Sequence, residues 1–317
     1  MDMYQKRKIR AEKKNNDSQK SFSKVPISWF PGHMAKTRRQ ITEDLKLVDV
    51  VIEILDARIP KSSQNPEIRD IIKDKKRIIV LNKSDLADEN DNNLWKLKFK
   101  KQGIEAVLVN SNSGKGIDEV LRLIQKIMEE ELQKLADKGR TGRKIRAMIV
   151  GIPNVGKSSF INRIAKKNSA IVGNRPGVTK AKQWIRINEQ IELLDTPGVL
   201  WPKFESNEVA LNLAFTGTIK DNLLEIIEVA YSLTKFLIEN YRESFLKRYK
   251  LDDNEVNEIL NNKEQEENQN IYEIMQLIGK KRGAIMSGGY IDDEKTSKII
   301  IEDFRTGKLG RITIEKC

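Results

Sequence analysis

The order of two motifs constrains the fold of this chain more than any other feature of the sequence. "NKSD", residues 82–85, follows the apolar run "RIIVL" and matches the box that reads guanine in GTP-binding domains. "GIPNVGKS", residues 151–158, fits the phosphate-loop pattern G-x-x-x-x-G-K-S, and it comes after the base box. An ordinary GTP-binding domain has these motifs in the opposite order. The sequence therefore predicts a domain whose segments occur in rotated order.

The phosphate loop lies between an apolar run that precedes it and a helical pattern, "SSFINRIA", that follows it, which is the context such a loop requires. Backbone N–H groups and the helix N-terminus favour a phosphate there. We expect Lys157 to neutralise the β- and γ-phosphates, as a catalytic residue, and Ser158 to ligate Mg²⁺. The nucleotide-binding residues predicted in this loop are Asn154, Val155, Gly156, Lys157, Ser158 and Ser159.

The base box supplies the selectivity for guanine. The Asp85 carboxylate accepts hydrogen bonds from the N1–H and the exocyclic amine of guanine, which adenine does not offer in that arrangement. Lys83 is expected along the base, and the end of the next predicted strand covers it from the other side. The predicted base-binding residues are Asn82, Lys83, Ser84, Asp85, Asn110, Ser111 and Asn112.

A third motif, "DTPG" at 195–198, ends an apolar run and predicts the segment that responds to GTP hydrolysis. We expect Asp195 to hold Mg²⁺ through water and the Gly198 N–H to contact the γ-phosphate. Thr179, in "RPGVTK", completes the Mg²⁺ shell in this interpretation. Thr179 and Gly198 are therefore predicted to be both nucleotide-binding and catalytic.

Apolar runs alternate with helical patterns and predict an α/β fold. Strands are expected within 48–58, 77–83, 105–111 and 145–151, a helix at 116–138, and two joined strands within 183–198. Joining the old termini of a P-loop GTPase domain and cutting after the "DTPG" strand produces this order, and such permutation is tolerated where termini lie close together. We predict a circularly permuted P-loop GTPase domain with a mainly parallel sheet at 25–204, and a small, mainly helical C-terminal domain at 205–317 that ends in a short strand.

Net charge and composition limit the classes of partner and of site that we expect for this protein. The net charge of +12 and a pI near 9.5 favour a polyanionic partner, of which nucleic acid is favoured over an acidic membrane face. Residues 1–24 are expected to form a disordered basic arm, with a transit peptide as the alternative. One Cys and one His exclude a disulfide framework and a Cys/His zinc site.

Five further stretches carry a resemblance to a known family, and they are "WFPGHMAKTRRQI" (29–41), "DARIPKSSQNP" (56–66), "DTPGVLWPKF" (195–204), "LAFTGTIKD" (213–221) and "GKKRGAIMSGGYID" (279–292). With the order of the boxes they closely resemble the ribosome biogenesis GTPase A family, from about residue 27 to residue 315. The resemblance implies a circularly permuted GTPase that uses GTP and Mg²⁺ in late assembly of the large ribosomal subunit. It also implies a C-terminal RNA-binding module. The basic arm departs from the bacterial pattern.

The resemblance also places this chain among the hydrophobic-substituted GTPases. Val199 and Leu200 stand where many GTPases have a Gln that orients the attacking water. In the family, His33 is the proposed substitute, and we weigh that catalytic role equally against simple packing of the 29–31 segment. In related GTPases the counterpart of Asn154 accompanies a K⁺ ion, with an ordinary loop-tip Asn as the alternative.

The expected partners are a large-subunit precursor and its rRNA, with neither DNA nor a membrane, and a monomer is expected. Lys280, Lys281 and Arg282, flanked by glycines, are either a solvated helix face or a contact to an RNA backbone. The expected location is the cytoplasm, with the organellar version of the same GTPase left open. An RNA-binding scaffold with a vestigial nucleotide site is the rival function, and the intact Asp85, Lys157 and Asp195 weigh against it.

Overall fold

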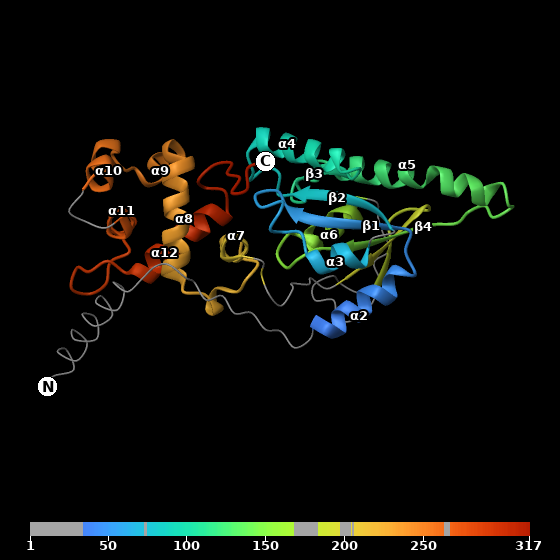
Figure 1. The fold of residues 1–317 in the computed structure, drawn as a ribbon, viewed down its shortest axis with the longest axis horizontal. Helices are drawn as coiled ribbons and strands as arrows, with labels where there is room; N and C mark the ends of the chain where they lie inside the picture. The colour runs from blue at the N-terminus through green and yellow to red at the C-terminus, as the bar shows by residue number, and fades with distance from the viewer. Residues whose placement is uncertain (1–33, 73–74, 168–182, 197–203, 205, 263–266) are drawn as a thin grey trace.

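A computed structural model describes residues 34–72, 75–167, 183–196, 204, 206–262 and 267–317. Figure 1 shows two lobes, one built on a sheet with helices on both faces and one built of helices alone. The predicted basic arm at 1–24 lies outside the described residues. So do His33, Thr179 and Gly198, three of the predicted catalytic residues.

The first lobe holds a six-stranded sheet in the order β3-β2-β1-β4-β6-β5. All neighbours are parallel except β5, which is antiparallel to β6. The prediction of a mainly parallel sheet with one hairpin is therefore confirmed. The strands are β1 (Val50–Asp56), β2 (Lys76–Asn82), β3 (Glu105–Val109), β4 (Ile145–Val150), β5 (Gln183–Arg186) and β6 (Ile191–Asp195).

The pairing of β1 with β4 brings the base box and the phosphate loop to one edge of the sheet, although their order along the chain is permuted. From this pair the sheet grows through β2 and β3 on one side and through β6 and β5 on the other. A ligand site in such a sheet lies outside the carboxyl ends of the strands, where the direction of growth reverses. The base box follows β2 and the phosphate loop follows β4, so both open at that edge, with β1 between their strands.

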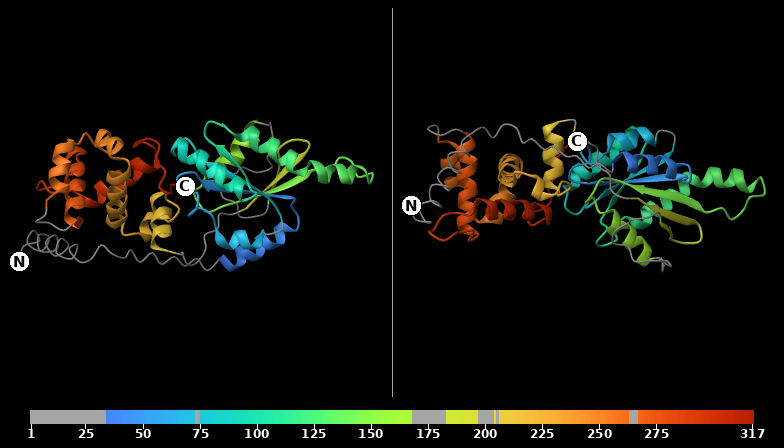
Figure 2. Two further views of the ribbon diagram at one scale, coloured as in Figure 1. Left: turned by 45° about the horizontal axis from the view of Figure 1, so that its top comes forward. Right: turned by 90° about the horizontal axis from the view of Figure 1, so that it is seen from below.

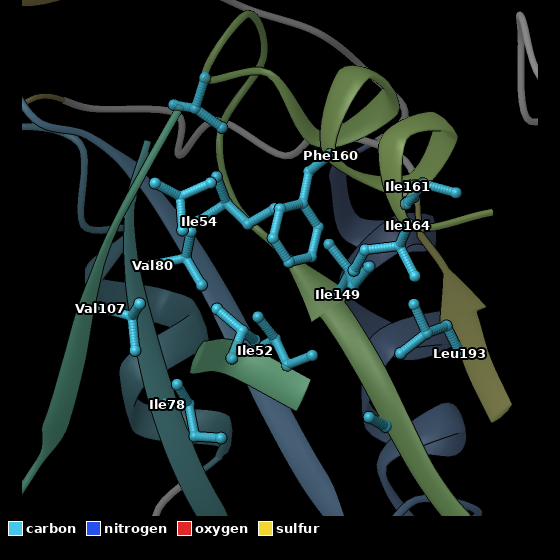
Figure 3. Close-up of a cluster of buried hydrophobic side chains, with 14 of the residues drawn as sticks. Ile52, Ile54, Ile78, Val80, Val107, Ile149, Phe160, Ile161, Ile164 and Leu193 are labelled. Carbon is cyan, nitrogen blue, oxygen red and sulfur yellow. The ribbon is translucent and has the colours of Figure 1, made fainter. Parts of the chain in front are cut away.

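Helices cover both faces of the sheet because successive strand residues point to opposite sides. On one face, α6 (Lys157–Lys167) and α5 (Ile117–Ala136) pack on residues such as Ile52 and Val80. Figure 3 shows Phe160 of α6 lying over this apolar layer. On the other face lie α2 (Met34–Leu45), α3 (Pro66–Ile71) and α4 (Glu89–Lys101), over residues such as Val51 and Leu81.

The second lobe is helical, as predicted, and has its own apolar core. Its central contact is between α8 and α12. Leu213 of α7 packs into the core of the first lobe, whereas its neighbour Phe215 packs into the core of the second. The elements are α7 (Asn207–Phe215), the 3-10 helix η1 (Asp221–Leu223), α8 (Ile226–Asn240), α9 (Arg242–Tyr249), α10 (Asp253–Leu260), α11 (Glu267–Lys281) and α12 (Asp293–Arg305).

The end of the chain differs from the prediction of a short strand. Residues 306–316, hereafter the C-terminal segment, have no strand and run back from α12 to the first lobe. The Ile312 N–H donates to Leu86 O and the Ile314 N–H donates to Arg58 O, so their partners lie in two different loops. No ladder forms because no single strand faces the segment. Figures 1 and 2 place the C-terminus beside the first lobe.

Candidate nucleotide-binding site

A pocket of about 600 Å³ lies where the base box and the phosphate loop meet. It brings together Asp85, predicted to read the base, and Lys157, predicted to bind phosphate. Two residues of the helical lobe, Arg305 and Thr306, also line it. The remaining lining residues are Asn82, Lys83, Leu86, Asn110, Ser111, Asn112, Asn154, Gly156, Ser158 and Ser159.

The phosphate loop connects β4 to α6 and turns through left-handed backbone conformations. Asn154 has a φ of 62° and Gly156 a φ of 96°. Lys157 is buried, and its Nζ donates to Gly151 O at 3.0 Å and to Ile152 O at 2.8 Å. Burial lowers the pKa of the Lys157 ammonium to about 8, against the opposite influence of the Asp195 charge.

Asn82 joins the phosphate loop to the loop predicted to cover the base. Its Nδ2 donates to Val155 O at 2.8 Å, and its Oδ1 accepts from the N–H and the hydroxyl of Ser111 at 3.1 and 2.8 Å. A Cβ added to Gly156 would lie 2.3 Å from that Nδ2, so a glycine is required for the close approach. The first residue of the base box therefore fixes the two loops on either side of it.

Lys83 and Asp85 are the residues of the base box that line the pocket beside Asn82. Lys83 has a left-handed backbone, with a φ of 58°. Its Nζ donates to Asn154 O at 2.7 Å and pairs with Asp56 Oδ2 at 2.9 Å, which lays its stem along one side of the pocket. Asp85 is exposed and lines the pocket, and its role as a guanine reader stays a prediction.

Asp56, at the end of β1, is a residue that motif reading did not assign to the site. It is buried and forms a two-pronged ion pair with Arg58, at 2.9 and 2.8 Å, beside its contact to Lys83. Burial alone would raise the pKa of the Asp56 carboxyl, but the Arg58 and Lys83 charges outweigh it and hold that pKa well below its usual range. The available signal was its place in "DARIP", one of the family stretches.

The helical lobe contributes residues that no motif predicted. The Arg305 guanidinium donates to Phe215 O and Ala214 O and pairs with Asp221, which fixes the end of α12 at the pocket. The Asn154 amide, at the tip of the phosphate loop, donates to Gly217 O in the turn after α7. Long-range contacts of this kind leave no local pattern in the sequence, so the sequence did not reveal them.

The predicted Mg²⁺ ligands are described only in part. Ser158 lines the pocket, and Asp195 stands at the end of β6 with its charge acting on Lys157. A hydroxyl and a carboxylate are the hard oxygen donors that Mg²⁺ prefers, so these two residues fit the ion. Val155 does not line the pocket, because its side chain is buried in the core.

Comparison with known proteins places the chain in a family. Ribosome biogenesis GTPase A of Bacillus licheniformis is 50% identical to it over 290 residues, which cover 92% of this chain and 98% of that protein. The chain belongs to the ribosome biogenesis GTPase A family. The crystal structure of GNP-bound YlqF from T. maritima matches 89% of this chain and 98% of its own, with 27% identity and a TM-score of 0.59.

The span of the chain that matches a GTPase domain family agrees with the permuted order of the motifs. The family described as 50S ribosome-binding GTPase matches residues 146–276, a span that begins inside β4 and leaves the base box upstream. The circularly permuted GTPase fold, GTP binding and membership of a ribosome biogenesis GTPase family are therefore established for the chain. Short integuments 2, mitochondrial, of Arabidopsis thaliana is 37% identical over 62% of this chain.

None of the helices in the described part of the chain is both long and apolar enough to cross a bilayer.

Proposed function

We propose that this protein is a GTP-dependent switch in late assembly of the large ribosomal subunit, bound to the precursor particle and its rRNA. The observation that carries the proposal is the single pocket lined by Asp85 and Lys157, in a chain 50% identical to a ribosome biogenesis GTPase A. An intact pocket favours an active GTPase over a scaffold with a vestigial site. The proposed location is the bacterial cytoplasm, because the bacterial relative is matched over nearly its whole length.

Within the site, we assign the roles that the motifs predict. Lys157 neutralises the β- and γ-phosphates, Asp85 reads guanine, and Asn110–Asn112 cover the base. Ser158, Thr179 and Asp195, the last through water, would hold Mg²⁺, which when bound neutralises charge on the transferred phosphoryl group. The Gly198 N–H is proposed to contact the γ-phosphate, so the chain from residue 199 onwards follows the state of the nucleotide.

Two further assignments concern GTP hydrolysis in a site that lacks the usual water-orienting Gln. Since Val199 and Leu200 cannot orient a water, we propose that His33 does so once the ribosomal particle orders the site. K⁺ near Asn154 is proposed as the charge that an arginine finger gives elsewhere. The Asn154 amide donates to Gly217 O, so its Nδ2 already has a partner and its oxygen atom is the group left for a cation.

The proposed rRNA contact lies on the helical lobe. Lys280 and Lys281 are exposed at the end of α11, and Arg282 follows them at the rim of a cavity of about 570 Å³. That cavity is also lined by Lys295, Lys298 and Lys308. Clustered lysines and arginines supply the sequence-independent attraction to an RNA backbone, which added salt weakens.

Sedimentation with ribosomal particles tests the proposal. We expect the protein to co-sediment with large-subunit precursors in the presence of a non-hydrolysable GTP analogue and to be released with GDP. We also expect GTP turnover to rise strongly when the particles are added. Binding that ignores the nucleotide, with equal turnover with and without particles, would favour the scaffold and exclude the switch. Lys157→Ala serves as the control that abolishes turnover.

A further inference from the structure

The C-terminal segment holds the loop that carries the guanine reader. The Ile312 N–H donates to Leu86 O at 2.8 Å, and the Asp88 N–H donates to Thr313 Oγ1 at 3.0 Å. Gly307 lies against the Leu86 side chain, since a Cβ on Gly307 would come within 2.6 Å of Leu86 Cδ2. A stretch more than 200 residues away in sequence thus packs on the residues that follow Asp85.

Arg311 makes the contacts that bracket Asp85. Its Nη2 donates to Ser84 O at 3.1 Å and its Nε donates to Ala87 O at 2.8 Å. Its Nη1 also pairs with Glu89 at 3.0 Å. Because the guanidinium is planar and its donors have fixed directions, it sets the separation of the two carbonyls on either side of Asp85.

The base loop, residues 83–88, also has supports within the first lobe, among them the turn that the Leu86 N–H closes by donating to Lys83 O at 2.9 Å. Ser84 is also held by its N–H bond to Val109 O and by the Asn92 amide. Beyond Asp85, the carbonyls of Leu86 and Ala87 are both taken by the C-terminal segment. A side chain that reads two donors of one base must be held within about 0.5 Å of its productive position. The segment supplies that constraint from outside the pocket.

We propose that Arg311 is a positioning residue for guanine selectivity. It does not line the nucleotide pocket and acts through the backbone of the base loop. When Arg311 is removed, the Asp85 carboxylate remains present but no longer lies where both of its oxygens meet the N1–H and the 2-amino group of guanine. The proposal rests on the proposed role of Asp85 as the guanine reader and is independent of the ribosomal role.

Measuring GDP and inosine diphosphate affinities by competition with a fluorescent GDP tests this role. Inosine keeps the N1–H but lacks the 2-amino group, so the ratio of the two affinities reports how well Asp85 is placed. For Arg311→Ala we expect GDP affinity to fall roughly tenfold and inosine diphosphate affinity to fall less, so that the ratio shrinks. The matched control is Arg242→Ala, which removes a half-buried arginine bonded to Asp253 and Asn257 on the helical lobe.

A lower unfolding temperature with an unchanged GDP-to-inosine-diphosphate ratio would overturn the proposal, because it would make Arg311 a merely structural contact. If the alanine variant does not fold, Arg311→Lys keeps the charge but cannot bridge two carbonyls in fixed geometry, and the same reduced ratio is expected. An unchanged ratio in the lysine variant would overturn the proposal equally. Neither result bears on particle binding, so the proposed function fails or survives separately.

Discussion

Among single residues, Lys157 combines a charge with burial inside the site. Its Nζ is held by the carbonyls of Gly151 and Ile152, which accept hydrogen bonds but carry no full charge. Burial therefore lowers the pKa of the ammonium to about 8. Phosphate oxygens beside Nζ would favour the charged form and raise that pKa. Near and above pH 8, phosphate binding should therefore shift Lys157 from the neutral amine towards the protonated ammonium.

This shift predicts that nucleotide binding takes up protons above pH 8. Between the pKa of about 8 for the free protein and the higher value with phosphates bound, the complex holds more protons. Affinity for GDP then falls as the pH rises, by at most about tenfold per pH unit. Calorimetry at pH 8.5–9 in buffers of different ionisation enthalpy measures the uptake. The dependence on buffer should vanish in Lys157→Met, and its absence from the wild type would contradict the prediction.

Asp85 carries the second prediction at this scale. Asp85→Asn should replace preference for GTP with preference for xanthosine triphosphate, because xanthine offers a carbonyl where guanine offers an amine. We expect GTP binding to weaken by about 2–4 kcal/mol, since the donors of guanine lose their acceptor. Competition between the two nucleotides measures the switch. Retained preference for GTP in the variant would remove Asp85 from the role of base reader.

At the scale of elements, Asn82 ties together the loops that follow β2, β3 and β4. Asn82→Ala removes three hydrogen bonds at a buried position and leaves the Val155 carbonyl and the Ser111 donors without this partner. We expect a loss of about 1–3 kcal/mol in unfolding free energy, read from urea denaturation, together with weaker GDP binding. Asn188→Ala, in the β5–β6 turn, is the control and should leave GDP affinity unchanged. Equal GDP affinity in both variants would contradict the prediction.

The sequence predicted those elements whose cause is local. The run from Val50 to Asp56 is apolar enough to be buried on both faces, so the sequence predicted a buried parallel strand. The phosphate loop and base box carry their chemistry in adjacent residues, which is why a single pocket could be expected. Arg305 and Arg311 act through contacts with distant backbone carbonyls, which have no spacing rule. The alternation of "RITIE" imitates a strand, but its partners lie in two loops.

On the scale of the whole molecule, the two lobes share structure and are not simply joined by a linker. The helix α7 places Leu213 in one core and Phe215 in the other. Glu315 sits at the junction, where its carboxylate accepts from the N–H groups of Lys61 and Ser62 and from the Asn212 amide of α7. The first lobe, the helical lobe and the C-terminal segment therefore meet at one carboxylate.

This shared structure predicts cooperative unfolding that depends on the C-terminal segment. We expect one calorimetric transition for the wild type, and GDP should raise its midpoint as a whole because binding to one lobe stabilises everything that unfolds with it. Glu315→Ala should cost about 2 kcal/mol, since it leaves backbone donors unpaired. Lys316→Ala is the matched control, because the Lys316 amine donates to the Asn240 side chain and lies over the Tyr241 ring and pairs with no backbone donor among the described residues.

Truncation after Thr306 extends the same test. Without the C-terminal segment, the contacts of Arg311, Ile312 and Glu315 with the first lobe are lost, while the α7 packing remains. The helical lobe also loses Leu309 and Ile312 from its core, so its own transition should move to lower temperature. We expect two transitions, of which GDP raises only the one that belongs to the GTPase lobe. A truncated protein that still unfolds in one GDP-sensitive transition would mean that α7, with the contacts of Arg58 to α12, is enough to couple the lobes. In that case the nucleotide site would be linked to the helical lobe through the phosphate loop, where Asn154 bonds Gly217, and not through the end of the chain.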